Sequence, residues 1–234
     1  MSAEHSATTL PLVNRRIPVF LQPGGVERLE NNTFIVESMR GSEDVWRRAG
    51  QEILQIHRQI FTPLIQRSDE VLHIYEVFLK EKLTDPTSMA VLLYDKQSQA
   101  LVGFSCLYPA SIPDDELFIG LSSVRKNEFQ TFQQRDGITF AQYQDMDRKT
   151  VEVGETAILP QFRNRGGWSL MMNSIDTHVE ELHAKHAYDW MVRVVRTEEE
   201  YADHVRGRYA NKRLLYESSY TRDVGPQKYY RFAL

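Results

Sequence analysis

The spacing of hydrophobic residues predicts two amphipathic helices in the first third of the chain. Apolar side chains recur about every 3.6 residues over residues 43–60, and Ser42 stands where a helix N-cap is expected. A second apolar stripe of the same period covers residues 69–84 and ends before an Asp-Pro pair. The run TFIVESM, residues 33–39, precedes both helices and predicts a short strand. The folded part of the chain is therefore expected to begin with a strand and two surface helices.

Continuous apolar runs predict a β-sheet in the remainder of the chain. Two of these runs are separated by a short polar gap, KQSQ, which predicts a hairpin. Amphipathic stretches at residues 169–186 and 198–219 predict two more helices, each between two strands. This order is typical of an α/β fold in which a crossover helix packs on a sheet. The expected strands are residues 88–95, 100–109, 150–159, 188–195 and 227–234.

Residues 110–149, between the hairpin and the fourth of the expected strands at 150–159, show no clear period. The polar segment at 125–137 indicates a helix, and residues 138–145 indicate an extended segment. We expect this stretch to be an insertion or a lid. Residues 1–30 are interrupted by Pro and Gly and are expected to form an N-terminal arm, so that residues 31–234 form a single domain.

Composition narrows the classes of function. The 234 residues include 41% hydrophobic residues, enough for a core, and the net charge of −4 argues against nucleic acid or an anionic membrane as a partner. The sequence has no membrane-span pattern and no secretory signal pattern, so the cytoplasm is the expected compartment. The single cysteine, Cys106, lies in an expected strand and is interpreted as packing.

The stretch LPQFRNRGGWSLMM, residues 159–172, joins the strand at 150–159 to the next helix. The first-turn N–H groups of such a helix are unpaired and attract phosphate. Gly166 and Gly167 allow a ligand to approach the backbone, and Arg163 and Arg165 add positive charge. The spacing matches neither the GxxxxGK[ST] loop nor the GxGxxG motif of nucleotide-binding proteins. The alternative is an ordinary turn with solvated arginines.

These residues resemble the GNAT superfamily of acyl-CoA-dependent N-acyltransferases. Its motif is a hydrophobic-x-Pro segment followed by Arg/Gln-x-x-Gly-x-Gly/Ala and a helix. Ile158-Leu159-Pro160 matches the first part, and residues 163–168 match the second except at Trp168. The resemblance implies a GNAT-like mixed, mostly antiparallel central sheet flanked by helices, with the long insertion before its fourth strand. It also implies acetyl-CoA or another acyl-CoA as cosubstrate. No metal is expected, because the sequence has no HExxH pattern and only one cysteine. The implied cofactor-binding residues are Ile158, Leu159, Arg163, Asn164, Arg165, Gly166, Gly167, Trp168 and Ser169.

The resemblance also implies catalytic residues. Glu152 is the first candidate for the general base that frees the attacking amine, and Glu155 is the second. A regular strand would put the two on opposite faces unless a bulge near Gly154 changes the alternation. Tyr216, placed in the last expected helix, is the candidate acid for the leaving thiolate. The alternatives are exposed carboxylates on a polar strand face and an aromatic ring used for packing.

Three functions remain open at this point. The first is an N-acyltransferase that moves an acyl group, most simply acetyl, from acyl-CoA to a primary amine of a small molecule, peptide or protein by direct attack. The second is a synthase of long-chain N-acyl amino acids or acyl-homoserine-type products. The third is a non-catalytic acyl-CoA-binding module, suggested by Trp168 and by the imperfect match around Tyr216. A monomer or a homodimer is expected.

Overall fold

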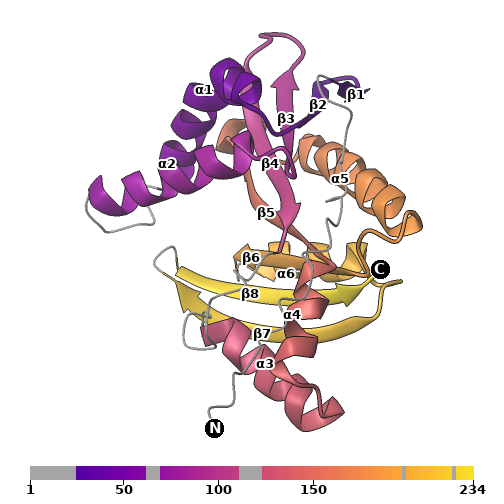
Figure 1. The fold of residues 1–234 in the computed structure, drawn as a ribbon. Coiled ribbons are helices and arrows are strands. Elements are labelled where there is room, and N and C mark those ends of the chain that lie inside the picture. Colours follow the sequence, from indigo (N-terminus) through magenta and orange to yellow (C-terminus); the bar gives the residue numbers. More distant parts are fainter. Residues whose placement is uncertain (1–24, 62–68, 111–122, 197–198, 223–224) are drawn as a thin grey trace, which may run out of the picture.

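The computed structural model describes residues 25–61, 69–110, 123–196, 199–222 and 225–234, which form one eight-stranded sheet (Figure 1). The strand order is β1-β2-β3-β4-β5-β6-β8-β7, and every neighbouring pair is antiparallel except β5–β6. The predicted mixed, mostly antiparallel sheet is confirmed. The strands are β1 Val26–Glu30, β2 Phe34–Arg40, β3 Met89–Asp95, β4 Leu101–Pro109, β5 Thr150–Ile158, β6 Trp190–Arg196, β7 Leu214–Arg222 and β8 Gly225–Ala233.

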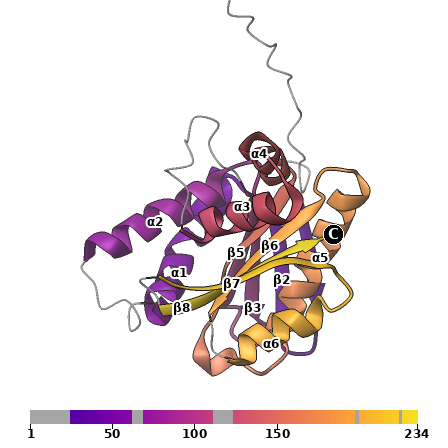
Figure 2. The same cartoon turned by 90° about the horizontal axis from the view of Figure 1, so that it is seen from below.

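Helices cover both faces of the sheet. The helices α1 and α2 lie on one face of the first half, and α5 lies on the opposite face (Figure 1). In the second half, α3 and α4 lie on one side of β7 and β8, and α6 lies on the other (Figure 2). The helices are α1 Glu43–Phe61, α2 Asp69–Thr84, α3 Ser123–Asp136, α4 Phe140–Arg148, α5 Gly167–Ala184 and α6 Glu199–Arg208.

Two hydrophobic clusters follow from the alternation of side chains along the strands. The cluster under α5 takes Val91 of β3 and Val153 of β5, whereas the cluster under α1 and α2 takes Leu92 and Phe104. The central strands β3 and β4 are buried over almost their whole length because both faces are covered. The sheet therefore separates two hydrophobic cores, one under α5 and one under α1 and α2.

Most of the predicted elements are confirmed. The helices at 43–60 and 69–84 correspond to α1 and α2, and the Ser42 hydroxyl accepts a hydrogen bond from the Val45 N–H at 3.3 Å. The hairpin and the strands at 33–39, 150–159, 188–195 and 227–234 are also present. The last five residues of the expected arm, Val26–Glu30, form the edge strand β1, and residues 1–24 lie outside the described residues.

Two predicted elements are wrong. Residues 138–145 are not extended, because Thr139 and Gln142 form a capping box that starts α4. The last helix does not reach residue 219: α6 ends at Arg208, and Leu214–Arg222 forms β7. Pairing with β8 supplies the backbone hydrogen bonds of this segment, so the sheet overrides its helical pattern.

A buried ionic cluster holds α3 and α4 against the sheet. Arg231 of β8 is 0% exposed, and its Nε donates to Glu128 Oε1 of α3 at 2.6 Å. Its Nη2 donates to Asp147 Oδ1 of α4 at 2.7 Å, and its Nη1 donates to Thr150 Oγ1 of β5 at 2.7 Å. Arg125 adds a second cation through a 2.5 Å contact with Asp147 Oδ2. Two guanidinium groups thus balance two carboxylates, and the inserted helices are a docked part of the fold.

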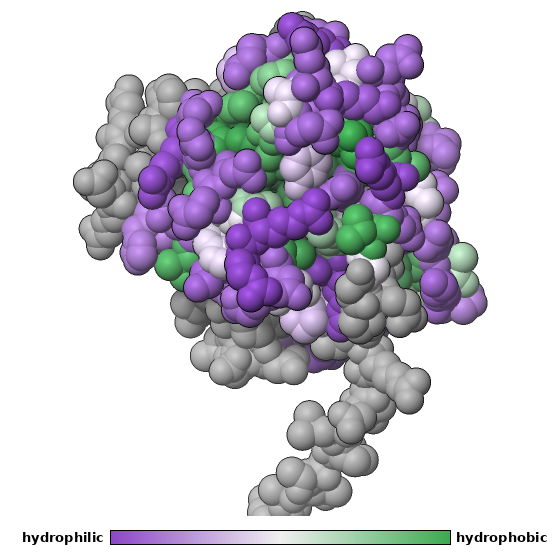
Figure 3. Space-filling view, turned by 90° about the horizontal axis from the view of Figure 1, so that it is seen from above, coloured by the Kyte–Doolittle hydropathy of each residue, from purple (hydrophilic) through white to green (hydrophobic). Residues whose placement is uncertain are grey.

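One face of the molecule is mainly polar. Seen from above, hydrophilic side chains dominate, and hydrophobic residues show in small patches between them (Figure 3). Val26 and Leu29 of the edge strand are among the exposed large hydrophobic side chains. No helix within the described residues combines the length and the apolar character that crossing a membrane requires.

Candidate functional site

The parallel strands β5 and β6 pair over only part of their length. Their contact runs from Thr150 opposite Trp190 to Val153 opposite Arg193, yet β5 continues to Ile158 and β6 continues to Arg196. Residues 154–158 of β5 and 194–196 of β6 therefore part from each other, and we call these two stretches the fork. On its other side β5 still pairs with β4 as far as Ile158, so its backbone stays extended along the fork.

A β-bulge lies where the fork begins. Ser105 of β4 pairs with Thr156, and Leu107 pairs with Val153, so two residues of β5 stand opposite one residue of β4. The bulge comprises Gly154 and Glu155. It is the bulge near Gly154 that the sequence analysis named as able to change the alternation of side chains. It reverses the alternation of side chains, because Val153 belongs to the cluster under α5 whereas Ala157 belongs to the cluster under α1 and α2. The parity argument that separated Glu152 from Glu155 therefore no longer applies.

Glu152 lies on the face covered by α1 and α2, beside Tyr108 of β4. The Tyr108 hydroxyl donates to Glu152 Oε1 at 3.3 Å. The same ring lies over the backbone of Gly154, where a Cβ would stand 2.4 Å from Tyr108 Cε1. Phe78 of α2 packs edge-on against Tyr108, and Lys82 Nζ lies 4.9 Å from the Tyr108 ring centre. Glu152 is thus a half-buried carboxylate just before the point where the fork begins, next to aromatic rings and a cation.

The amide groups expected to polarise a thioester are only partly available. The Leu159 N–H donates to the Val102 carbonyl of β4 at 2.9 Å, so it does not point into the fork. Because successive residues of a strand point their backbone groups in opposite directions, the Ile158 N–H and C=O face the fork instead. Arg163 Nε donates to the Ile158 carbonyl at 3.1 Å, so this carbonyl is bound by a side chain instead of by a neighbouring strand. The Ile158 N–H is therefore the amide left for a ligand.

The loop before α5 has the geometry of an anion-binding helix start. Asn164 and Gly166 have positive φ of 59° and 82°, and Gly166 is the N-cap of α5 without a side-chain cap. The first-turn N–H groups are thus left uncapped by the chain, and Arg165 and Ser169 beside them are exposed. Position 167 is a glycine for a different reason. Gly167 is buried, and a Cβ there would stand 2.8 Å from Leu93 Cδ2. Of the two glycines, only Gly166 is therefore exposed to a ligand.

Trp168, the residue that departs from the motif, turns toward α6. Its ring lies 5.8 Å from the ring of His204, and the Arg208 guanidinium carbon lies 5.8 Å from its centre. The side chain is half-buried against the cluster under α5. The indole therefore packs between the two helices.

Tyr216 does not occupy the place expected for it. It lies on β7, not on a helix, and its ring packs edge-on against Phe132 of α3. Glu152 pairs with Val192, Val192 with Arg231, and Arg231 with Tyr216, so Glu152 and Tyr216 lie in one row across four strands. Three strand spacings place their backbones about 14 Å apart. The predicted placement of Tyr216 on a helix is therefore wrong, and its role as the acid stays a prediction.

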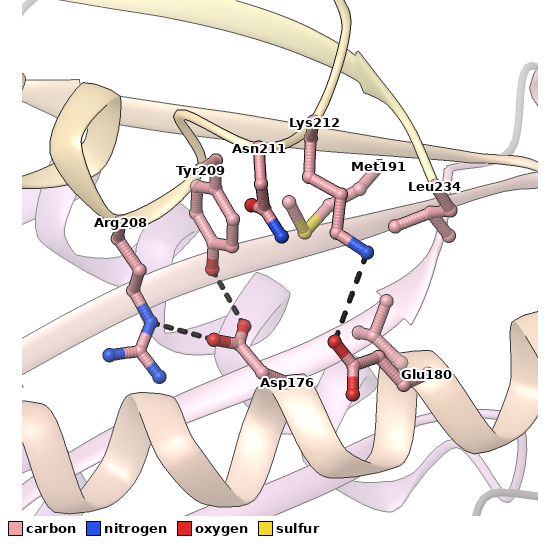
Figure 4. Close-up of a pocket in the computed structure, with 9 residues that line it drawn as sticks. Asp176, Glu180, Met191, Arg208, Tyr209, Asn211, Lys212 and Leu234 are labelled. Atoms are coloured by element: carbon pink, nitrogen blue, oxygen red, sulfur yellow. Dashed lines mark hydrogen bonds and ion pairs between the residues drawn. The ribbon is translucent and has the colours of Figure 1, made fainter.

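A second tyrosine follows the last helix directly. Tyr209 comes straight after α6, and its hydroxyl donates to Asp176 Oδ1 of α5 at 2.8 Å (Figure 4). Arg208 Nε donates to the other oxygen of Asp176 at 2.6 Å. Burial raises the pKa of Tyr209 to about 12. These contacts border a pocket of about 80 Å³, a small fraction of the volume that a nucleotide-sized ligand occupies. The pocket lies at the junction between α5 and α6 and is too small to hold a whole nucleotide.

The sequence interpretation missed two residues of the site. Arg193 is buried on β6 beside the fork, and a charged residue inside the apolar run WMVRVV was the available signal. Tyr108 carries no sequence signal, because its role depends on the bulge beneath it. Within the part of the chain that the structure describes, no three His, Cys, Asp or Glu side chains gather in a way that suits a metal ion.

No protein-family model matches the chain, and no curated protein sequence matches it. Solved structures do match its fold. FeeM, an N-acyl amino acid synthase from uncultured soil microbes, aligns with a TM-score of 0.50 and 13% identity over 90% of this chain and 91% of its own. NAA60 of Arabidopsis thaliana in complex with acetyl-CoA aligns with a TM-score of 0.48 and 15% identity over 85% and 97%. A GCN5-related N-acetyltransferase from Brucella melitensis aligns with a TM-score of 0.45 and 11% identity over 89% and 78%.

Proposed function

We propose that this chain, which has the GNAT fold, transfers an acyl group from acyl-CoA to a primary amine, with acetyl as the simplest acyl group. The observation that carries the proposal is the fork, together with the uncapped glycine start of α5 at its end. The parted strands leave backbone N–H and C=O groups for an extended amide-containing arm, and the helix start suits a pyrophosphate. Few ligands other than an acyl-CoA combine these two features.

In direct attack of the amine on the thioester, each functional group at the fork has one role. The lone pair of the amine attacks the thioester carbonyl carbon, and Glu152 accepts the proton that the nitrogen loses through a chain of waters, because Ile158 lies six residues further along β5. The Ile158 N–H donates to the oxyanion that forms on the carbonyl oxygen. When the C–S bond breaks, the sulfur leaves as a thiolate and takes up a proton. Glu155, at the bulge, is the second candidate for the base.

The acid for the thiolate is proposed to be Tyr209 rather than Tyr216. The resemblance implies an acid in the last helix, and Tyr209 follows α6 directly. Its hydroxyl keeps its proton at neutral pH, since burial raises its pKa to about 12. Replacing each tyrosine by Phe separates the two assignments, because packing survives and proton donation does not. We expect Tyr209→Phe to slow thiol release and Tyr216→Phe to leave it unchanged.

The test of catalysis is the release of free thiol from acetyl-CoA in the presence of a panel of primary amines. We expect Glu152→Gln to lower the rate by about a hundredfold or more while the affinity for coenzyme A stays the same. Glu37→Gln is the matched control, because Glu37 is also a half-buried sheet carboxylate but lies on β2. Full activity of Glu152→Gln across the pH range would remove Glu152 from the mechanism.

The same assay separates the alternative functions. A series from acetyl-CoA to palmitoyl-CoA identifies the acyl chain, and a maximum at long chains would favour an N-acyl amino acid or acyl-homoserine-type synthase. Binding of acyl-CoA without thiol release for any amine would identify a non-catalytic acyl-CoA-binding module. If no acyl-CoA raises the midpoint of thermal unfolding, the proposal fails as a whole.

A further inference from the structure

Arg193 of β6 is a buried cation with two guanidinium nitrogens that find no hydrogen-bond partner among the described residues. Its side chain is only 2% exposed, and neither Nε nor Nη1 has a hydrogen-bond partner. It forms no ion pair within the described residues. Arg231 on the neighbouring strand β8 is also buried, but every one of its guanidinium nitrogens donates to an oxygen.

The position of Arg193 is the base of the fork. It belongs to the last pair that joins β5 and β6, opposite Val153, and the two strands part immediately beyond it. Its neighbour Met191, two residues earlier on β6, faces the cluster under α5, so the Arg193 side chain points to the α5 and α6 face. Its charge acts on Tyr209, where it opposes the rise in pKa that burial causes. Glu152 lies on the other face of the same strands.

An arrangement of this kind is costly in the absence of a ligand. A buried guanidinium with unsatisfied donors loses its hydration without gaining hydrogen bonds. Structures retain such a group where a partner arrives from outside. The partner must be an acceptor, because guanidinium nitrogens only donate, and it must reach the floor of the fork between α5 and α6. An extended chain that carries carbonyl or phosphate oxygens meets both conditions.

We propose that Arg193 binds an oxygen of the phosphopantetheine arm of the acyl-CoA, from the face opposite the one where Glu152 receives the amine. This inference rests on the proposed function. The arm offers amide carbonyl oxygens and, at its end, phosphate oxygens, and both are acceptors for a guanidinium. Bound in this way, the arm completes the hydrogen bonding of Arg193 and is fixed along the fork.

The test is a calorimetric titration of coenzyme A into the wild type, Arg193→Met and Arg193→Lys. We expect Arg193→Met to weaken binding about tenfold or more, because a hydrogen bond to a charged group is lost. Arg193→Lys keeps the charge and should recover part of the affinity. The ligand-free Arg193→Met protein should unfold at the same temperature as the wild type or higher, since an unsatisfied cation has been removed from the core. Arg135→Met, an exposed arginine of α3, is the control and should change neither value.

Pantetheine, which lacks the phosphates, identifies the acceptor oxygen. Equal weakening of coenzyme A and pantetheine by Arg193→Met places the contact on an amide, and weakening of coenzyme A alone places it on a phosphate; both support the inference. Unchanged affinity of Arg193→Met for coenzyme A overturns it, and so does a loss of ligand-free stability with no loss of affinity. If Arg193→Met fails to fold, the affinity of Arg193→Lys and Arg193→Gln decides in its place. A wild type that binds no coenzyme A would instead refute the proposed function.

Discussion

Gly154 shows how one residue determines the position of Glu152, the candidate general base. The ring of Tyr108 occupies the space that a Cβ would take, with Tyr108 Cε1 at 2.4 Å. A side chain at this position would have to push the ring away, and the ring carries the hydroxyl that donates to Glu152. The absence of a side chain at the bulge therefore determines where the carboxylate of Glu152 is held.

We expect Gly154→Ala to lower the free energy of unfolding by about 1–3 kcal/mol, because it overpacks the space under Tyr108. Urea-induced unfolding measures this change. Gly207 provides the control, since it is also a glycine but has nothing within 4 Å of an added Cβ. Gly207→Ala, in α6, should leave stability unchanged or raise it by up to about 1 kcal/mol. Equal effects of the two substitutions would show that Tyr108 yields freely.

Single residues were predictable where the motif itself carried the signal. The positive φ of Gly166 and the exposure of Arg165 agree with a loop built around an anion. Gly167 was predicted to bind the cofactor, whereas the structure shows it buried against Leu93. Tyr216 was assigned from a sequence interval, and an interval does not reveal the change from helix to strand. Arg193 was overlooked because apolar neighbours made its strand resemble ordinary core.

At the scale of elements, the anchor of α3 and α4 depends on the balance of charge around Arg231. We expect Arg231→Met to cost about 3–5 kcal/mol, because Glu128 and Asp147 would then be buried with one cation fewer. Proteolytic cleavage between residues 123 and 148 should accelerate as these helices leave the sheet, and urea unfolding gives the free energy. Arg135→Met removes an exposed arginine of the same insertion and should cost less than about 1 kcal/mol. Comparable losses in the two variants would argue against the ionic anchor.

His57, buried in α1, makes stability depend on pH. Burial lowers its pKa from 6.5 to about 4. As the pH falls below about 6.5, His57 becomes protonated in the unfolded chain but stays neutral in the folded chain. The free energy of unfolding therefore declines until the pH reaches about 4. The loss amounts to about 2–3 kcal/mol. The free energy of unfolding measured between pH 7 and pH 4 should show this slope. It should become shallower in His57→Gln, where the buried His178 still contributes, and should persist in full in the exposed-site control His73→Gln.

The elements that sequence reasoning placed correctly have strong local signals. The helix α1 has both a clear apolar stripe and a capping serine, and β3 and β4 are separated by a short polar gap. The helix α4 was missed because its signal is a cap formed by Thr139 and Gln142 rather than a stripe. The strand β7 follows from its pairing with β8, a contact made by a later part of the chain.

At the scale of the whole molecule, the sheet consists of two halves joined by the pairing of β5 with β6. This pairing comprises four consecutive residue pairs, from Thr150–Trp190 to Val153–Arg193. The strands beyond it are held on their outer sides only. The fork, like the edge strands β1 and β7, is therefore a part of the sheet where backbone amides are expected to exchange readily with solvent.

We expect acyl-CoA to slow amide hydrogen exchange at residues 154–158 and 194–196, because the bound arm would occupy the inner edges of the fork. Exchange in β2 should stay unchanged, since that strand is paired on both sides with β1 and β3. Mass spectrometry of peptic fragments resolves these segments. Protection spread evenly over the sheet would point to general stabilisation rather than to an arm bound at the fork.

The joint between the two halves is braced on both faces. On one face Arg231 of β8 reaches Thr150 of β5 across the intervening strand, and on the other face Asp176 of α5 holds Arg208 of α6. The width of the fork is thus set by the folded chain before any ligand arrives. A preorganised opening of this kind spends little conformational entropy on binding, so the affinity for its ligand should reflect the contacts made rather than the cost of closing around it.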